Sequence, residues 1–261
     1  MSIEYLLEHN PPAQLKERLD NLGAALMDLT KPLGMTDDNH KYGWQGAGPW
    51  PGVTAITGWQ DGLNGSGGLT TWAAKIGAEA AWNEGAVPLE EATAAALRAL
   101  NRQKNIGSAV HGKIEDLLAG KAWSRTPETG LYLDGFSLFM AEKHPEFIHS
   151  EQVVLSPTHH YGGRFDFIAK LDGRIALVDV KTGKAKPSHR LQLAAYAYAD
   201  FIGKADDPTQ YPLPKIKDFY VLLLRESSYE LVPMAVTRAD RRHFVELVKM
   251  FHKARAWEVI K

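Results

Sequence analysis

Three charged residues lie in or beside the apolar runs of residues 161–181 and could act together. Asp179 and Lys181 interrupt a run of aliphatic residues, and Asp166 lies between two phenylalanines upstream. Side chains two residues apart on a strand point to the same face, so Asp179 and Lys181 would project together. A buried charge without a partner is costly. Two carboxylates and a lysine on neighbouring strands therefore indicate a metal-dependent site that cleaves phosphodiester bonds.

Each of these residues also has a simpler interpretation. The aspartates could cap the elements that follow them, and Lys181 could be an exposed lysine at the start of the next loop. The combination of the three favours a catalytic site, because paired carboxylates can hold one or two hard cations that bind the attacking and leaving oxygens. Lys181 would then orient or deprotonate the attacking water, or offset charge on the phosphate.

Two predicted helices add polar side chains that are one turn apart. His111 and Glu115 share a helix face, and a neutral imidazole is a common metal ligand. Glu115 would either reach a second metal through water or pair with a surface charge. Gln192 and Tyr196 lie on the helix after the site strand, where both could face the phosphate while apolar neighbours fill the core.

Basic residues are concentrated locally although the formal net charge is only -1. Residues 181–190 contain four basic residues and no acid, and such a strip can bind nucleic acid on a neutral protein. Tryptophans are numerous in the first third of the chain and can stack on unpaired bases, although most should belong to the core. Basic residues from 238 to 255 alternate with acids, so we interpret them as a solvated helix face. The expected DNA contacts are Lys184, Lys186, Arg190, Arg164 and Trp72.

The sequence contains no cysteine, which excludes disulfides, thiolate zinc sites and iron–sulfur clusters. A metal would be held by Asp, Glu, His or backbone oxygen, and this suits one or two ions of Mg²⁺ or Mn²⁺. No nucleotide-binding signature is present. No apolar run approaches the roughly 18 residues of a membrane span, and the N-terminus lacks a signal pattern. We therefore expect an intracellular, cytoplasmic protein.

The order of predicted elements indicates an α/β protein with a central mixed sheet flanked by helices. Residues 36–70, rich in Gly, Pro and Trp, predict irregular structure. Helices are predicted at 1–35 (one helix within this range), 69–84, 88–104, 106–119, 132–144, 187–202 and 239–256. Strands are predicted at 149–155, 162–170, 174–181, 217–224 and 229–236. Residues 1–105 would form a largely helical region that packs on a core of residues 106–261, as one compact domain.

The ordered set of site residues resembles the RecB-like branch of the PD-(D/E)xK nuclease superfamily. The resembling residues are His111, Asp166, Asp179-Val180-Lys181, Gln192 and Tyr196. The resemblance implies a restriction-endonuclease-like core in which His111, both aspartates and the Val180 carbonyl bind the metal and Lys181 is catalytic. It also implies that Gln192 and Tyr196 support the DNA side of the site. The segment before Asp166 resembles the Gly-x-x-Asp strand of this branch, with an extra glycine.

Residues 52–57, Leu69 and 72–75 resemble the N-terminal region of small phage-encoded RecB-like exonucleases and of mitochondrial genome-maintenance exonucleases. CRISPR-associated and helicase-linked relatives often carry a four-cysteine iron–sulfur cluster, and this chain has no cysteine. The resemblance thus implies a cluster-free DNA exonuclease, acting on DNA ends or single strands in phage-type recombination, repair or replication. A recombinase or annealing protein is a plausible partner. The alternatives are a structure-specific or duplex endonuclease of the same fold, a catalytically silent nucleic-acid-binding module and a phosphatase acting on small phosphates.

Overall fold

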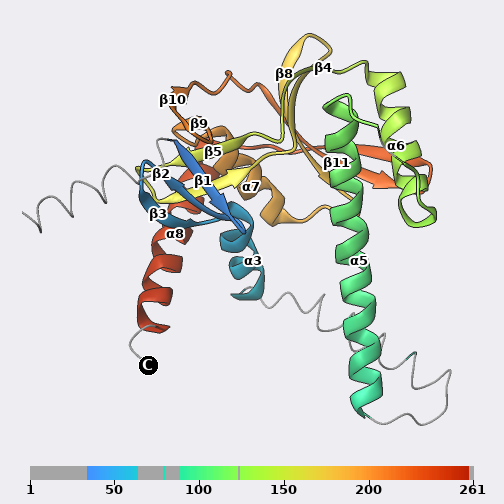
Figure 1. Ribbon diagram of the computed structural model, residues 1–261, viewed down its shortest axis with the longest axis horizontal. Helices are drawn as coiled ribbons and strands as arrows, with labels where there is room; N and C mark the ends of the chain where they lie inside the picture. Colours follow the sequence, from blue (N-terminus) through green and yellow to red (C-terminus); the bar gives the residue numbers. More distant parts are fainter. Residues whose placement is uncertain (1–33, 64–78, 80–88, 123, 259–261) are drawn as a thin grey trace, which may run out of the picture.

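The computed structural model describes residues 34–63, 79, 89–122 and 124–258 (Figure 1). The predictions made for residues 1–33 and for the helix at 69–84, which includes Trp72, lie outside these ranges except at residue 79. Within the described part, no helix has the length and apolar character needed to cross a membrane.

A five-stranded mixed sheet forms the centre of the fold, in the strand order β12-β11-β8-β7-β4. Its strands are β4 (Glu146–Ser150), β7 (Phe167–Leu171), β8 (Arg174–Lys181), β11 (Asp218–Arg225) and β12 (Ser228–Pro233). Only β8 and β11 pair in parallel; the other pairs are antiparallel. Asp172 and Gly173 join β7 to β8 with positive φ at both positions, as a tight hairpin turn requires. The predicted mixed sheet and this turn are confirmed.

Helices cover both faces of this sheet (Figure 1). On one face lie α5 (Leu89–Leu118) and α6 (Pro127–Lys143), which pack on Val178, Val180 and Leu222. On the other lie α3 (Val53–Leu63), α7 (Pro187–Ala197) and α8 (Arg238–Glu258), whose core includes Leu177 and Val221. Burial on both faces explains why β8 is a nearly continuous apolar run. Because side chains alternate, Asp179 and Lys181 lie on the same face of β8 as Leu177.

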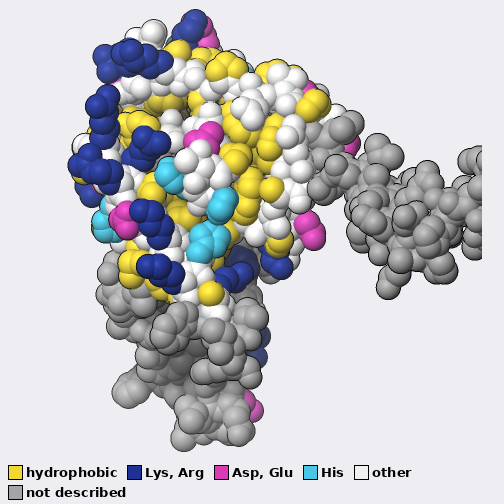
Figure 2. Space-filling model, turned by 90° about the vertical axis from the view of Figure 1, so that its left-hand side faces the viewer, with side chains coloured by type: hydrophobic (Ala, Val, Ile, Leu, Met, Phe, Trp, Pro, Cys, Tyr) yellow, Lys and Arg dark blue, Asp and Glu magenta, His cyan; other side chains and the backbone are white. Residues whose placement is uncertain are grey.

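Helix α8 is amphipathic. Phe244, Leu247, Val248 and Phe251 are buried at helical spacing, and the basic residues from 238 to 255 are exposed. The predicted solvated helix face is therefore confirmed. Lysine, arginine and histidine side chains gather on the side of the molecule to which α8 and the smaller sheets belong (Figure 2).

Two smaller sheets lie beside the central one. One has the order β10-β9-β5-β6 and the other β1-β2-β3. Their bounds are β1 (Met35–Asp38), β2 (Lys41–Trp44), β3 (Ala47–Pro51), β5 (Val153–Ser156), β6 (Tyr161–Arg164), β9 (Phe201–Lys204) and β10 (Asp207–Tyr211). The prediction of irregular structure at residues 36–70 is wrong for β1, β2, β3 and α3. Composition misled here because Trp44, Trp50 and Tyr42 are the buried core of the small sheet.

The extra glycine before Asp166 has a packing role. A Cβ atom at Gly162 would lie 2.4 Å from Cγ of Tyr42, so only glycine lets the ring of Tyr42 pack on β6. An isolated parallel bridge also joins Gly52 to Gly162. The N-terminal sheet is therefore packed directly on the strand that leads to Asp166.

Several predicted elements differ from the observed ones in their limits. The helices expected at 88–104 and 106–119 form the single helix α5, so the predicted boundary at 105/106 falls inside it and the division into two regions remains a prediction. The helix expected at 187–202 ends at Ala197, and the unpredicted β9–β10 hairpin follows. Each of the strands expected at 149–155 and 162–170 is divided in two, because the chain passes there from one sheet to another.

Candidate active site

The two strand breaks face each other and position Asp166. The amide of Glu151 donates to the carbonyl of Asp166 (2.8 Å), and the amide of Phe165 donates to that of Gln152 (3.2 Å). The Asp166 carboxylate leaves the strand toward β8, where one oxygen accepts from the Val180 amide. Its other oxygen lies 3.1 Å from Nδ1 of His111 on α5. The strand break thus places Asp166 in contact with His111, so two of the predicted site residues lie together.

A second group of contacts surrounds Asp179, which is only 2% exposed. The ammonium of Lys181 is 2.6 Å from Oδ2 of Asp179 and also donates to the Val180 carbonyl (3.2 Å). From α7, Nε2 of Gln192 donates to Oδ1 of Asp179 and to the hydroxyl of Tyr196, both at 2.9 Å. The expected projection of Asp179 and Lys181 to one side is confirmed. Gln192 contacts the carboxylate directly, and Tyr196 contacts Gln192.

Burial and charge act in opposite directions on these groups. Burial alone would raise the pKa of Asp166, but the neighbouring His111 and Lys181 outweigh it and lower that pKa. Burial raises the pKa of Asp179, and Lys181 offsets this only partly. Oδ2 of Asp179 is buried and has no hydrogen bond of good geometry, although the Lys181 ammonium is near. An additional cation would therefore be favourable at this oxygen.

Glu151 is a candidate ligand that the sequence did not reveal. It lies between β4 and β5 with a left-handed φ of 51°. One ligand atom from each of Glu151, His111 and Asp166 lies within 4.8 Å of the others, a spacing that can hold a metal ion. Burial, reinforced by Asp166 and Glu115, raises the pKa of Glu151 to about 8. Such a cluster of carboxylates is unfavourable without a cation, as expected of a functional site.

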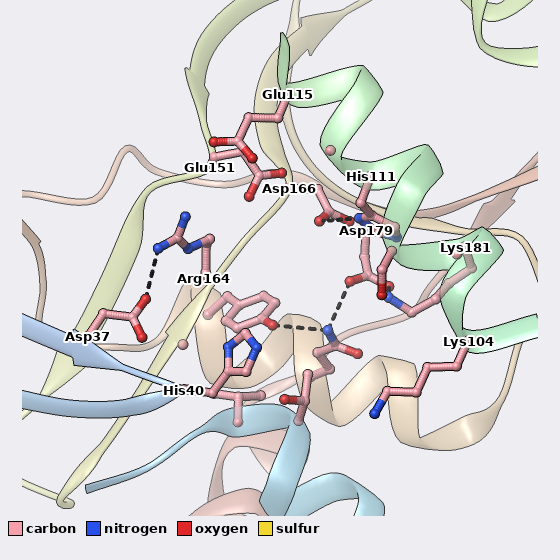
Figure 3. Close-up of a pocket in the computed structure, with 18 of the residues that line it drawn as sticks. Asp37, His40, Lys104, His111, Glu115, Glu151, Arg164, Asp166, Asp179 and Lys181 are labelled. Atoms are coloured by element: carbon pink, nitrogen blue, oxygen red, sulfur yellow. Dashed lines mark hydrogen bonds and ion pairs between the residues drawn. The ribbon is translucent and has the colours of Figure 1, made fainter. Parts of the chain in front are cut away.

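All of these side chains open into one cavity of about 960 Å³ (Figure 3). Glu115 lines it near Glu151, on the same side as His111. Two residues that were not predicted, Lys104 from α5 and His40 from the β1–β2 turn, also point into it. The sequence carried no signal for either, because both depend on how distant elements pack.

The predicted DNA contacts are dispersed. Arg164 lines the cavity and pairs with Asp37 (2.8 Å). Lys184 and Lys186 are exposed, and Lys186 lies 3.8 Å from Asp61 of α3. Arg190 pairs with the buried Asp240 (2.8 Å) and lines a smaller, separate cavity. The basic segment lacks acids of its own, but acids from α3 and α8 face it.

Comparison with known proteins identifies the family. A family model of the PD-(D/E)XK nuclease superfamily matches residues 80–258. An alkaline exonuclease from Laribacter hongkongensis is a structural neighbour, with 14% identity, a TM-score of 0.35 and coverage of 58% of this chain and 80% of that chain. The protein SSO0001 is another, with 15% identity, a TM-score of 0.28 and coverage of 46% and 57%.

These two structural likenesses are too weak to bear on activity. The sequence has no match among curated proteins. The family model covers most of the chain and includes every predicted site residue from His111 to Tyr196. It confirms the resemblance at the level of the superfamily, together with the expected fold class. The chain belongs to the PD-(D/E)XK nuclease superfamily, whose members hydrolyse phosphodiester bonds with divalent metal ions.

Proposed function

We propose that this protein is a Mg²⁺- or Mn²⁺-dependent DNA exonuclease. The observation that carries the proposal is the contact between Asp179 and Lys181 beside Asp166, in a cavity large enough for a nucleotide. Membership of a nuclease superfamily supports hydrolysis of phosphodiester bonds. The preference for DNA ends or single strands follows from the resemblance to cluster-free RecB-like exonucleases. A role in phage-type recombination, repair or replication, a recombinase partner and a cytoplasmic location rest on the same resemblance.

The donor set fits a hard divalent cation. His111, Asp166, Asp179 and the Val180 carbonyl would hold it, with Glu151 as a further ligand and Glu115 within reach of a second ion. The short spacing of the ligand atoms and the buried oxygen of Asp179 support this fit. When bound, the metal supplies Lewis-acid polarisation of the phosphoryl oxygens.

The chain's own residues would orient water and stabilise charge. Asp179 holds the Lys181 ammonium at 2.6 Å, and Gln192 in turn holds Asp179. The ammonium would orient the water that attacks phosphorus and would donate hydrogen bonds as negative charge grows on the phosphate. A new bond forms from the water oxygen to phosphorus while the ester bond to the leaving sugar oxygen breaks, and that oxygen takes up a proton.

Two alternatives are separable by experiment. An endonuclease of the same fold would cut covalently closed circular DNA, which an exonuclease leaves intact. A silent binding module is less well supported, because Asp166, Asp179 and Lys181 are all present and in mutual reach.

The test is a nuclease assay on end-labelled single-stranded, linear duplex and closed circular DNA, with Mg²⁺, Mn²⁺ or chelator. We expect metal-dependent loss of linear substrates only, abolished by Lys181→Met. The matched control is Lys170→Met, which removes an exposed lysine of β7 that lies outside the cavity. Cutting of circles would favour the endonuclease, and binding without cleavage under any condition would contradict the proposal.

A further inference from the structure

The cavity has a wall that the family chemistry does not require. The tip of the β1–β2 hairpin brings Asp37, Asn39 and His40 to it, opposite the side formed by α5 and β8 (Figure 3). The hairpin is anchored by buried Tyr42 on β6, so its tip has a defined position relative to Asp166. A nucleotide bound at the metal ligands would therefore have this hairpin as its neighbour.

His40 occupies a backbone position that favours a different residue. Asp38 pairs with Lys41, so Asn39 and His40 form a two-residue hairpin turn. Both have positive φ, 49° and 60°. Asn-Gly is the pair that fits this turn best, and histidine at the second position is strained where glycine would not be. The imidazole is exposed and points into the cavity, which gives the strain a functional explanation.

Arg164 on β6 contacts the hairpin and lines this wall of the cavity. Nη2 of its guanidinium donates to Oδ2 of Asp37 at 2.8 Å, which fixes the side chain across the gap between β6 and β1. A guanidinium has five N–H donors, and its planar fork suits phosphate oxygens. The side chain is 40% exposed toward the cavity, so donors remain available to a substrate.

We propose that His40 and Arg164 form a phosphate-binding subsite for the DNA strand, next to the phosphate that is cut. The proposal rests on the nuclease function proposed above and identifies how the strand is held. Asp37 is the partner of Arg164 in the free protein and is not itself part of the subsite. The N-terminal hairpin then forms one wall of the substrate cleft.

Two variants of the same ion pair separate binding from structure. Arg164→Gln and Asp37→Asn both remove the exposed pair and should lower the melting temperature by similarly small amounts. Their effects on DNA should differ. For a fluorescent single-stranded oligonucleotide with Ca²⁺ in place of the catalytic metal, Arg164→Gln should raise Kd by roughly tenfold or more. It should also reduce the slope of log K against log salt by about 0.7, the value for one lost phosphate contact.

Asp37→Asn should leave that slope unchanged and Kd the same or lower, because the guanidinium is retained with more free donors. His40→Gly should raise Kd by roughly threefold to tenfold while the melting temperature stays the same or rises. Equal losses of binding in Arg164→Gln and Asp37→Asn would assign the pair a purely structural role. Unchanged Kd and slope in both Arg164→Gln and His40→Gly would overturn the subsite.

A small substrate keeps this test distinct from the test of the nuclease itself. Thymidine 5′-(p-nitrophenyl phosphate) has one phosphodiester and cannot reach a neighbouring subsite. We expect Arg164→Gln and His40→Gly to lose a smaller factor of the hydrolysis rate on this substrate than on DNA. Failure of the wild type on this substrate and on DNA alike would contradict the proposed function. Equal losses by the variants on both substrates would contradict the subsite alone.

Discussion

The cavity holds its acidic side chains in two different ways. Asp179 and Lys181 are alternate residues of one strand that is buried on both faces, and their contact follows from the pleat. Glu151 and Asp166 are fifteen positions apart and meet where two strands pass from one sheet to another. Ligands of the same chemistry thus arise from local spacing on one side and from a tertiary crossing on the other. The sequence reveals the contact of the first kind, whereas at the crossing it revealed Asp166 but not its neighbour Glu151.

The largest effect is expected at Asp179 and Lys181 of β8, which form the strand side of the site. Asp179→Asn removes the charge that holds the Lys181 ammonium and a proposed metal ligand, so the cleavage rate at saturating Mn²⁺ should fall roughly a thousandfold. The measurement is the initial rate on a labelled linear oligonucleotide. Asp172→Asn in the β7–β8 turn is the control and should retain activity, since asparagine accepts its positive φ. A rate for Asp179→Asn within tenfold of the wild type would remove the strand side from the mechanism.

A smaller effect is expected at Glu151, which lies where the two strands cross from one sheet to another. Glu151→Gln should raise the Mn²⁺ concentration needed for half-maximal rate by roughly 10- to 100-fold, with most of the rate regained at high metal. Glu115→Gln, further from the cluster of ligand atoms, should raise it less. Metal titrations of the initial rate measure both. Identical titration curves for Glu151→Gln and the wild type would show that the crossing supplies only Asp166.

The last effect concerns the stability of the fold rather than the cleavage rate, in the absence of metal. The pKa of Glu151 is raised from 4.5 to about 8, so the folded state binds a proton that the unfolded state releases. This contribution to stability is complete below pH 4.5 and is lost as the pH rises through about 8. Thermal unfolding in chelator should therefore show the wild type losing stability relative to Glu151→Gln between these values, by a few kcal/mol at most. Parallel pH profiles of the two proteins would contradict this assignment.

The sequence predicted the strand side of the site because its signals were local. The Asp-x-Lys spacing in an apolar run, the Asp-Gly turn and the one-turn spacing of Gln192 and Tyr196 all describe residues that interact along one element. The central mixed sheet followed from the order of such elements. These predictions needed no knowledge of how distant segments pack.

The rest depended on packing. Glu151 lies inside a predicted strand. No glycine or proline next to it in the sequence indicates the strand break that brings it close to Asp166. The aromatic residues of β2 and β3 were predicted to be part of an irregular segment. A small sheet is stabilised by the core on which it packs rather than by the strand propensity of its own residues. His40 and Lys104 reach the cavity only through those tertiary placements.

The most direct test is anomalous diffraction from a crystal grown with Mn²⁺ and a non-cleavable oligonucleotide. The account predicts a manganese peak bound by Asp179 of β8 and by Asp166 at the crossing. Glu151 or His111 would complete the protein ligands, and a phosphate oxygen would face Lys181. Coordinating oxygens would lie within about 2.5 Å of the peak. A peak that contacts neither aspartate, or DNA bound away from this cavity, would contradict it.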